Sequence, residues 1–429
     1  MRAARARALA LLVVLAPVAP GVVQASPLDL FGLGPRGEAM SAVVADVRGA
    51  EAVHANPAGV ALADRAEGLS AYSYHHFALE LDGRDAQVLD AHGVTLGLAI
   101  PLWRAPVIAL GVALHLPDDF LARIQLIPAS EPHFVLLDNP HRIEVDPVLA
   151  FRPTPWLAIG AGAHILADAI GGITFNVGVV GGEQVGESAI DLVMPTRAAP
   201  VGGVIVTPIP RLRIGASARG ALDLRLGLDI VANVDAAAVS GDAVISVRSS
   251  SYYTPAKVAA GIAYDVTPDL TVAADAAWNA WSHLRGGLPD VRVLVELGIT
   301  PPLVSALFPP DNFADTVSFR AGAEWRHDVR GGCQTLALRA GYGFEPSPVP
   351  AQTGLPSLAD NDRHIASLGA GWTTGAGRFL RGPVTFEAAL SGHFLRGRDT
   401  VKNQALFPGR GFSSGGTIIG GTVSAKVQF

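Results

Sequence analysis

The last segment of the sequence, residues 415–429, alternates strictly between two kinds of side chain. A period of two is the period of a β-strand, in which successive side chains point to opposite faces. One row is apolar and the other polar, so the two faces need different surroundings. With an aromatic residue at its end, the segment is typical of the closing strand of an outer-membrane barrel, which faces lipid on one side and the lumen on the other. The apolar row is Ile419, Gly421, Val423, Ala425, Val427 and Phe429, and the polar row is Thr422, Ser424, Lys426 and Gln428.

The same alternation recurs in residues 270–278, 317–326, 335–345 and 384–394. In each segment one row is apolar and the other carries nearly all of the charges. In a soluble β-sandwich the charged row would face bulk water and the apolar row a shared core. In a membrane barrel the charged row faces inward. We therefore predict that the apolar rows, which include Phe319 and Trp325, lie on the outside of a barrel.

Four charged side chains of these rows are predicted to face the lumen: Arg320, Glu324, Arg339 and Glu345. Residues that lie opposite each other on neighbouring strands are close enough to interact. We expect these four to neutralise one another across the strands. The alternative is that one of the arginines attracts the carboxylate of a ligand.

The hydropathy pattern argues against a bundle of membrane helices. The mean hydropathy is +0.35 and only 16% of the residues are charged. This composition is more apolar than that of a typical soluble protein. Three arginines precede the apolar residues 8–16, and Val23-Gln24-Ala25 fits a cleavage site, so residues 1–25 are predicted to be a secretory signal peptide. No later window has the roughly twenty apolar residues that a spanning helix needs. A closed barrel satisfies every backbone polar group in lipid without a helix.

Motifs for catalysis, metal binding and nucleic-acid binding are weak. The single cysteine, Cys333, allows neither an internal disulfide nor a cysteine-based metal site. The net charge is −6 and no basic run is present, so no nucleic-acid partner is expected. Gly32-x-Gly34-x-x-Gly37 fits the dinucleotide pattern, but no strand precedes it. His75 and His76 are adjacent, so in a strand they point to opposite faces. We expect no enzymatic activity, no cofactor and no metal.

The connections between alternating segments differ in length in a regular way. Short connections lie near residues 103–106, 153–155, 208–210, 267–269, 328–332 and 375–382, and long ones near 117–140, 171–188, 235–240, 285–315, 346–362 and 396–416. Bacterial barrels have short periplasmic turns and long external loops. The pattern predicts an antiparallel barrel of about fourteen strands over residues 68–429, with both termini in the periplasm. Aromatic residues near the short turns predict a girdle at the lipid boundary: Trp103, Phe151, Trp156, Tyr264, Trp325, Trp372 and Phe429.

Residues 26–67 do not alternate and are rich in small side chains. They precede the first predicted strand, so they can fold back into the lumen as a plug. The segment ends in Asn56-Pro57-Ala58-Gly59, with Asp46 upstream. In these residues the sequence resembles the long-chain fatty acid and aromatic hydrocarbon transporter family of the outer membrane (FadL-like), in which a small-residue hatch ends in an NPAG-type motif. Val47-Arg48-Gly49 departs from the family, which commonly has a second acidic residue there.

The resemblance extends over most of the chain. Residues 252–284 are similar to the family's eighth and ninth strands, including a Trp-x-x-Trp-Ser ending. Residues 336–350, followed by Asp360-x-Asp362-Arg363, are similar to its late hairpin. The family implies passive import of a hydrophobic small molecule past the hatch and out through a lateral gap made by a kinked strand.

The resemblance assigns control of the pathway to hatch residues Asp46, Asn56, Pro57, Ala58 and Gly59. A plain turn is the alternative, because proline restricts φ and glycine tolerates unusual backbone angles. A lateral gap is expected in the second and third strands, where glycine and proline weaken pairing. The candidates for this gap are Gly97, Pro101 and Gly111; the alternative is that the glycines are there only because barrel strands are rich in glycine.

Two long loops are candidates for capturing the solute. Asp118 is expected to cap one helix, and Thr300 a second helix that begins at Pro301-Pro302. Each helix would present one apolar face. The first face consists of Phe120, Leu121, Ile124 and Ile127, and the second of Leu303, Val304, Leu307 and Phe308. The alternative is that these faces only pack against each other and the barrel rim.

The sequence therefore predicts a monomeric outer-membrane barrel of a Gram-negative-type bacterium that imports long-chain fatty acids or related hydrocarbons. A structural or secretion-associated barrel of the same fold is the alternative, since fold alone does not determine function. A barrel lipase is disfavoured because Ser391 and His393 share the inner row. Expected partners are membrane lipid, the hydrophobic ligand and the barrel-assembly machinery, which would recognise the strand that ends at Phe429.

Overall fold

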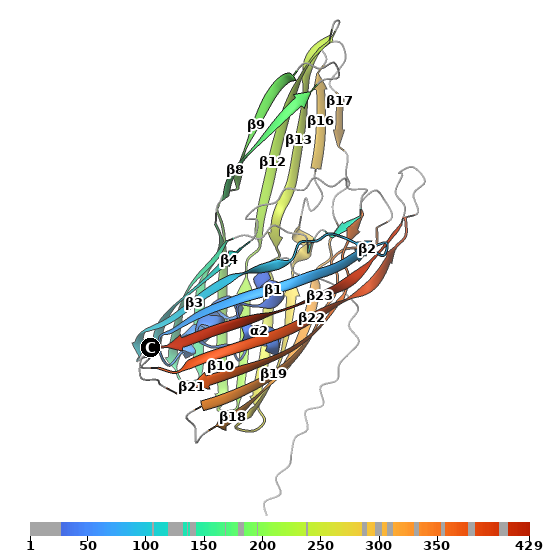
Figure 1. Ribbon diagram of the computed structural model, residues 1–429. Coiled ribbons are helices and arrows are strands. Elements are labelled where there is room, and N and C mark those ends of the chain that lie inside the picture. Colours follow the sequence, from blue (N-terminus) through green and yellow to red (C-terminus); the bar gives the residue numbers. More distant parts are fainter. Residues whose placement is uncertain are drawn as a thin grey trace, which may run out of the picture.

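The computed structural model describes most of the chain after the N-terminal segment. The described residues are 27–104, 107–118, 132–134, 136–137, 143–167, 169–178, 184–194, 196–236, 239–284, 290–296, 303–306, 312–329, 334–352, 357–375, 382–402 and 411–429. They form a tilted β-barrel with short helices inside it and a narrow β-arm that rises beyond one rim (Figure 1). The predicted signal peptide lies outside the described residues and stays a prediction.

The barrel consists of fourteen antiparallel strands, counted over the described residues. Each strand pairs with the next barrel strand along the chain, and β1 pairs with both β3 and β23, which closes the cylinder. The predicted strand number is therefore confirmed. The strands are β1 (Glu67–Leu81), β3 (Ala91–Arg104), β4 (Val107–Pro117), β6 (Glu144–Thr154), β7 (Leu157–Leu166), β10 (Arg197–Ile209), β11 (Leu212–Arg219), β14 (Lys257–Asp265), β15 (Leu270–Asn279), β18 (Thr316–Val329), β19 (Gln334–Glu345), β21 (Arg363–Thr374), β22 (Val384–Thr400) and β23 (Phe412–Gln428).

The apolar rows of these strands face outward. On β23, Val423 is 56% exposed, whereas its polar neighbours Thr422 and Ser424 are buried inside the barrel. On β18, Phe319 and Trp325 are likewise exposed. A soluble protein would bury the apolar row and expose the charged one. The inverted arrangement means that this cylinder is surrounded by an apolar medium and has a polar bore.

The six short connections predicted from the sequence all fall between consecutive barrel strands. The C-terminus lies at the same end: the amide of Phe429 donates to the carbonyl of Ala66, just before β1, and the amide of Gln428 donates to that of Pro383, just before β22. Figure 1 places this terminus at the rim opposite the β-arm. All seven predicted girdle aromatics are exposed on the barrel surface.

The long connections at the other rim contain more strand than the sequence analysis predicted. Strands β8 (Ala169–Gly178) and β9 (Gln184–Met194) form a hairpin, and β12 (Leu222–Ala236), β13 (Val239–Thr254), β16 (Asp290–Glu296) and β17 (Leu303–Ala306) form a separate sheet. Together they make the arm in Figure 1. Smaller elements are β2 (Arg84–Asp85), β5 (His133–Phe134), η3 (Trp281–His283) and β20 (Leu358–Ala359).

The helix predicted after Thr300 is wrong. Residues Leu303 and Val304 belong to β17, which pairs with β16. An isolated helix this short is marginal in water, whereas a strand satisfies the open backbone groups at the edge of β16. Leu307 and Phe308 lie outside the described residues, as do Phe120, Leu121, Ile124 and Ile127 of the other predicted capture helix.

Among the described residues, no helix combines the length and the apolar character needed to cross a bilayer.

The plug consists of five short helices inside the barrel (Figure 1, blue). They are α1 (Pro27–Phe31), α2 (Pro35–Met40), η1 (Gly49–Glu51), α3 (Ala52–Ala55) and η2 (Pro57–Leu62). Helix α2 packs against β19, β21 and β22, and η2 packs against β6, β7 and β10 on the opposite wall. The plug therefore spans the bore from wall to wall.

Glycines on the inner face of the barrel allow the plug backbone to touch the wall. A Cβ atom on Gly322 would lie 1.9 Å from the carbonyl oxygen of Met40, and one on Gly160 would lie 2.4 Å from the carbonyl carbon of Pro57. Real Cβ atoms do not approach backbone so closely, so a larger residue at either position would displace the plug.

Candidate functional site

The side chain of Asn56 connects the plug to two barrel strands. It is fully buried, and its Oδ1 accepts from the amide of Ala58 at the start of η2. Its Nδ2 donates to the carbonyl of Val44 at 2.8 Å and lies 3.2 and 3.3 Å from the carbonyls of Val204 on β10 and Ala216 on β11. Asn56 thus caps a helix, holds an earlier part of the plug and contacts the wall, which is more than a plain turn requires.

Backbone geometry and close packing explain the other three residues of the Asn56-Pro57-Ala58-Gly59 motif. Pro57 is the first residue of η2, where its missing N–H is not needed. Ala58 packs against Ala158 and Ile205 of the wall. A Cβ atom on Gly59 would lie 2.3 Å from the carbonyl oxygen of Val47. The glycine is therefore explained by close packing within the plug.

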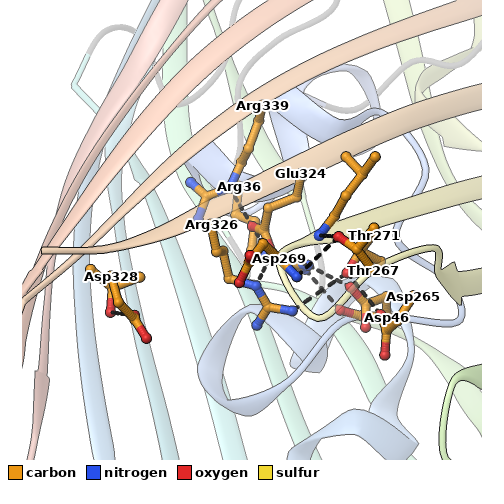
Figure 2. A network of polar contacts seen from close by, with 12 residues as sticks. Arg36, Asp46, Asp265, Thr267, Asp269, Thr271, Glu324, Arg326, Asp328 and Arg339 are labelled. Carbon is orange, nitrogen blue, oxygen red and sulfur yellow. Dashed lines mark hydrogen bonds and ion pairs between the residues drawn. The ribbon is translucent and has the colours of Figure 1, made fainter. Parts of the chain in front are cut away.

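Asp46 belongs to a buried ion-pair network. It pairs with Arg36 of the plug at 2.6 Å and with Arg213 of β11 at 2.7 Å. Figure 2 shows Asp46 and Arg36 beside Glu324 and Arg339 of the wall. Burial alone would lower the pKa of Arg36, but Glu324 and Asp46 raise it well above its ordinary value, so the guanidinium stays charged.

The network continues from Arg36 across the wall. Arg36 pairs with Glu324 at 3.0 Å, Glu324 with Arg339 at 2.6 Å, and Arg339 with Glu387 at 2.8 Å. Lys426 then lies 3.6 Å from Glu387 and 3.5 Å from Glu51 of the plug. The ion pairs therefore run from the plug to β18, β19, β22 and β23 and back to the plug.

All four predicted lumen charges take part in cross-strand pairs. Arg339 contacts Glu324, and Arg320 contacts Glu345. Glu345 also pairs with Arg363 at 2.6 Å. Mutual neutralisation is thus visible in the structure, as expected from the sequence, but it also includes Arg36, which the strand pattern does not reveal because residue 36 is far from these strands in sequence.

A second contact between plug and wall involves His75 of β1. Its Nε2 lies 3.0 Å from Oε1 of Glu38, and its ring stacks on Phe31 at a centroid distance of 3.4 Å. Ser391 also donates to Glu38. The neighbouring His76 points outward and pairs with Asp90, so the two histidines lie on opposite faces, as predicted.

A cavity of about 90 Å³ lies between the plug and strands β11, β14, β15 and β18. One part of its lining is apolar and the other polar. Asp29 lies 3.1 Å from Arg219 and 3.8 Å from Lys257. Burial alone would raise the pKa of Asp29, but Arg219 and Lys257 hold it well below its ordinary value. The apolar part includes Leu33, Val43, Val44, Val47, Ala259 and Ala277, and the cations are Arg219, Lys257 and Arg320.

Of the three residues predicted to weaken strand pairing, the two glycines do not do so. Gly97 and Gly111 lie in continuous ladders of β3 with β1 and β4 and of β4 with β6, and Pro101 is next to a bulge. The two glycines instead accommodate the plug, because Cβ atoms there would lie 3.1 Å from Ala50 and 2.8 Å from Val53, respectively. The prediction of weakened pairing is therefore wrong for Gly97 and Gly111, whereas at Pro101 the pairing of β3 with β4 is irregular.

The pairing of β6 with β7 is interrupted beside Pro147, which was not among the residues predicted to weaken pairing. Between β6 and β7, the pairs Val145↔Ile165 and Val148↔Gly162 are present, but the two positions between them are not paired. Pro147 occupies one of these positions and has no N–H to donate. This interruption could not be located from the sequence, because it depends on which strand lies beside β6.

The arrangement defines a class of protein: an outer-membrane barrel closed by an N-terminal plug. The family model described as "Outer membrane protein transport protein (OMPP1/FadL/TodX)" matches residues 139–378, more than half of the chain, and the chain belongs to this family. Members are transporters of the outer membrane, and the protein is located in the outer membrane of a Gram-negative bacterium.

Several solved structures share the fold. A Pseudomonas aeruginosa FadL homologue is 16% identical, with a TM-score of 0.59 over 96% of this chain and 100% of that one. The P. putida toluene transporter TodX is 16% identical, with a TM-score of 0.57 over 94% and 99%. The Ralstonia pickettii toluene transporter TbuX is 17% identical, with a TM-score of 0.53 over 94% and 100%. No curated protein sequence matches the chain. At these identities the likeness concerns the fold.

Proposed function

We propose that the protein imports hydrophobic small molecules passively, with the plug controlling passage. The observation that carries this proposal is the cavity between plug and wall, which combines an apolar part with a charged part of three cations and the carboxyl groups of Asp29, Glu51 and Asp275. An apolar wall favours an apolar solute by about 25 cal/mol per Å² of buried surface. A carboxylate at one end of the solute would compete with Asp29 for Arg219 and Lys257, so long-chain fatty acids are the proposed substrate class, with alkanes and monoaromatic hydrocarbons as related solutes.

The substrate is tested by uptake into cells that carry or lack the protein. Labelled long-chain fatty acid, alkane and toluene are supplied separately, and initial rates are compared. Slower entry of fatty acid in deletion cells supports the proposal. Equal entry of all three solutes contradicts it.

Control by the plug predicts that Asn56→Ala changes the rate of uptake. The substitution removes the contacts with Val44, Val204 and Ala216, so the plug should leave its position more often and uptake should rise several-fold. The barrel strands are untouched, and the heat-modifiable mobility of the barrel should stay the same. Unchanged uptake in a correctly folded variant would remove the gating role.

For the exit route, we propose a lateral path through the wall beside Pro147, where the β6–β7 ladder is interrupted. The test is a disulfide across this position, Pro147→Cys with Ala163→Cys, in a Cys333→Ser background. Oxidation should slow uptake, and reduction should restore it. A matched control is Ala260→Cys with Ala276→Cys, a directly paired position of β14 and β15. Equal effects of oxidation on both pairs would refute the lateral path.

A structural or secretion-associated role is the second candidate. It is favoured by the close fit of the plug, since inner-wall glycines leave no room for a Cβ atom at the contact with Met40 or Pro57. Under that role the three uptake rates would not depend on the protein. The proposed partners are the same in both cases: membrane lipid around a monomeric barrel, and assembly machinery that recognises the terminal strand with Phe429.

A further inference from the structure

Three side chains that are far apart in the sequence meet at the contact between plug and wall. His54 belongs to α3 of the plug, Asp146 to β6 and His164 to β7. All three are buried, and one ligand atom from each lies within 4.8 Å of the others. The Nδ1 atom of His54 lies 3.0 Å from Oδ2 of Asp146, and the Nδ1 atom of His164 contacts Oδ1 of the same carboxylate.

Each imidazole also has a carboxylate on its other side. The Nε2 atom of His54 lies 3.6 Å from Oδ1 of Asp29, and the Nε2 atom of His164 lies 3.6 Å from Oε2 of Glu144. In metal sites of proteins, a ligating histidine almost always donates its other N–H to such a partner, which holds the ring in position. The cluster therefore contains two imidazoles that meet at Asp146, each with a carboxylate 3.6 Å from its other nitrogen, close enough to become such a partner after a small movement.

The donor set fits a transition metal ion. Imidazole nitrogen suits Zn²⁺, Co²⁺ and Ni²⁺, whereas Mg²⁺ and Ca²⁺ prefer oxygen ligands only. In a tetrahedral zinc site with bonds of about 2.0–2.1 Å, neighbouring ligand atoms lie roughly 3.3 Å apart. The His54–Asp146 distance is close to that value, and the three ligand atoms all lie within 4.8 Å of one another, so a modest contraction and a water molecule as fourth ligand would complete the site.

Binding would move protons only within the cluster. Arg219 lies 3.2 Å from Nε2 of His54 and donates to it, so the ring proton is on Nδ1 and points to Asp146. When Nδ1 binds a metal, the ring proton moves to Nε2 and is donated to Asp29, so Arg219 gives up its contact with Nε2 and keeps its ion pair with Asp29. For His164, Glu144 can accept in the same way. The neutral imidazole is the form that binds a metal.

The location connects the cluster to the plug. His54 lies two residues before Asn56, and Asp146 and His164 occupy one of the two unpaired positions in the β6–β7 ladder beside Pro147. An ion held by these three residues would join α3 to both strands at the interruption. It would hold the plug in place and keep the two strands together.

We propose that His54, Asp146 and His164 form a binding site for a divalent transition metal, Zn²⁺ being the class that fits best, and that the bound ion fastens the plug to the barrel wall. The site itself is independent of what the barrel transports. Only an effect of the metal on uptake would rest on the proposed function.

The first test is metal binding by the full-length protein in detergent micelles after treatment with a chelator. Co²⁺ replaces Zn²⁺ as a visible probe. We expect one equivalent per chain and the absorption bands of tetrahedral Co²⁺, with displacement by Zn²⁺. His54→Gln and His164→Gln should each weaken binding by more than about 100-fold, and Glu144→Gln by about 10–100-fold.

The matched control is His75→Gln, which removes another barrel histidine that contacts a plug carboxylate. It should bind Co²⁺ like the unmodified protein. Heat-modifiable mobility checks that each variant is folded. Absence of tetrahedral bands in the unmodified protein, or unchanged binding in the folded double variant His54→Gln/His164→Gln, overturns the proposal. Loss of binding in His76→Gln would identify an adventitious surface site and overturn it as well.

The second test measures the plug directly. In a Cys333→Ser background, Ala55→Cys next to His54 is labelled with a maleimide. Zn²⁺ should slow labelling at least tenfold, and His164→Gln should abolish this protection without removing the label site. Protection that persists in His164→Gln contradicts the fastening role. Because labelling does not involve a solute, its result is independent of whether the barrel imports fatty acids.

Discussion

At the scale of single residues, the plug is held by charges that are buried in pairs. Asp46 and Glu324 share Arg36 (Figure 2). Arg213 connects Asp46 to Asp265, the last residue of β14. A buried ion pair adds little net stability against an apolar replacement, but removal of one partner leaves an uncompensated charge. Such contacts stabilise the plug in one position, because a displaced plug would leave buried charges without partners and would have a much higher free energy.

Arg36→Met should therefore loosen the plug. Asp46 and Glu324 lose a shared cation, which costs about 3–5 kcal/mol for a buried pair and raises the population of the displaced plug about 100-fold or more. Hydrogen exchange of residues 27–62 measures this change. Arg326→Met is the control, because Arg326 is more exposed and lies 3.6 Å from Glu324. Equal exchange in both variants would show that Arg36 does not hold the plug.

At the scale of elements, the sequence predicted the barrel strands well and the external segments poorly. Alternation marks a strand wherever one face is apolar and the other polar, and the six short turns fell where predicted. The residues after Thr300 lacked such context: a short apolar run fits a helix or a strand equally well. Residues 303–306 form strand β17 because they pair with β16. The sequence of residues 300–308 does not show that β16 is their neighbour.

Contact between η2 and the wall depends on glycine at the matching positions of the strands. Gly160→Ala places a Cβ atom 2.4 Å from the carbonyl carbon of Pro57, so η2 should be pushed away from β7. We expect greater protease sensitivity of the plug and faster uptake. Gly202→Ala on the adjacent strand is the control, since its nearest atom would be 3.7 Å away, an ordinary contact. A plug that is equally protected in both variants would refute the assignment.

At the scale of the whole molecule, the barrel has the reverse of the polarity of a soluble protein: its apolar residues face outward and its charged residues face inward. Leu390 on β22 is 71% exposed and pairs with Gly421 in the middle of the wall. This exposure is stable only if lipid covers it.

Leu390→Arg should accordingly destabilise the barrel in lipid by about 2–4 kcal/mol if the residue lies at the bilayer midplane. Urea titration of the protein refolded in phospholipid vesicles measures the free energy of unfolding. Leu390→Met is the control, since it keeps an apolar side chain. Equal stability of the arginine and methionine variants would mean that this face is not in hydrocarbon.

The period-two rows, the small-residue N-terminal segment and the Asn56-Pro57-Ala58-Gly59 motif were sufficient to predict a plugged outer-membrane barrel. These features are local, because each strand must match lipid and lumen along its own length. The joining of Arg36 to Glu324, the interrupted ladder at Pro147 and the meeting of His54 with Asp146 and His164 were decided by the tertiary structure. Each depends on which strand lies opposite which plug residue, and closure of the barrel around the plug sets that arrangement.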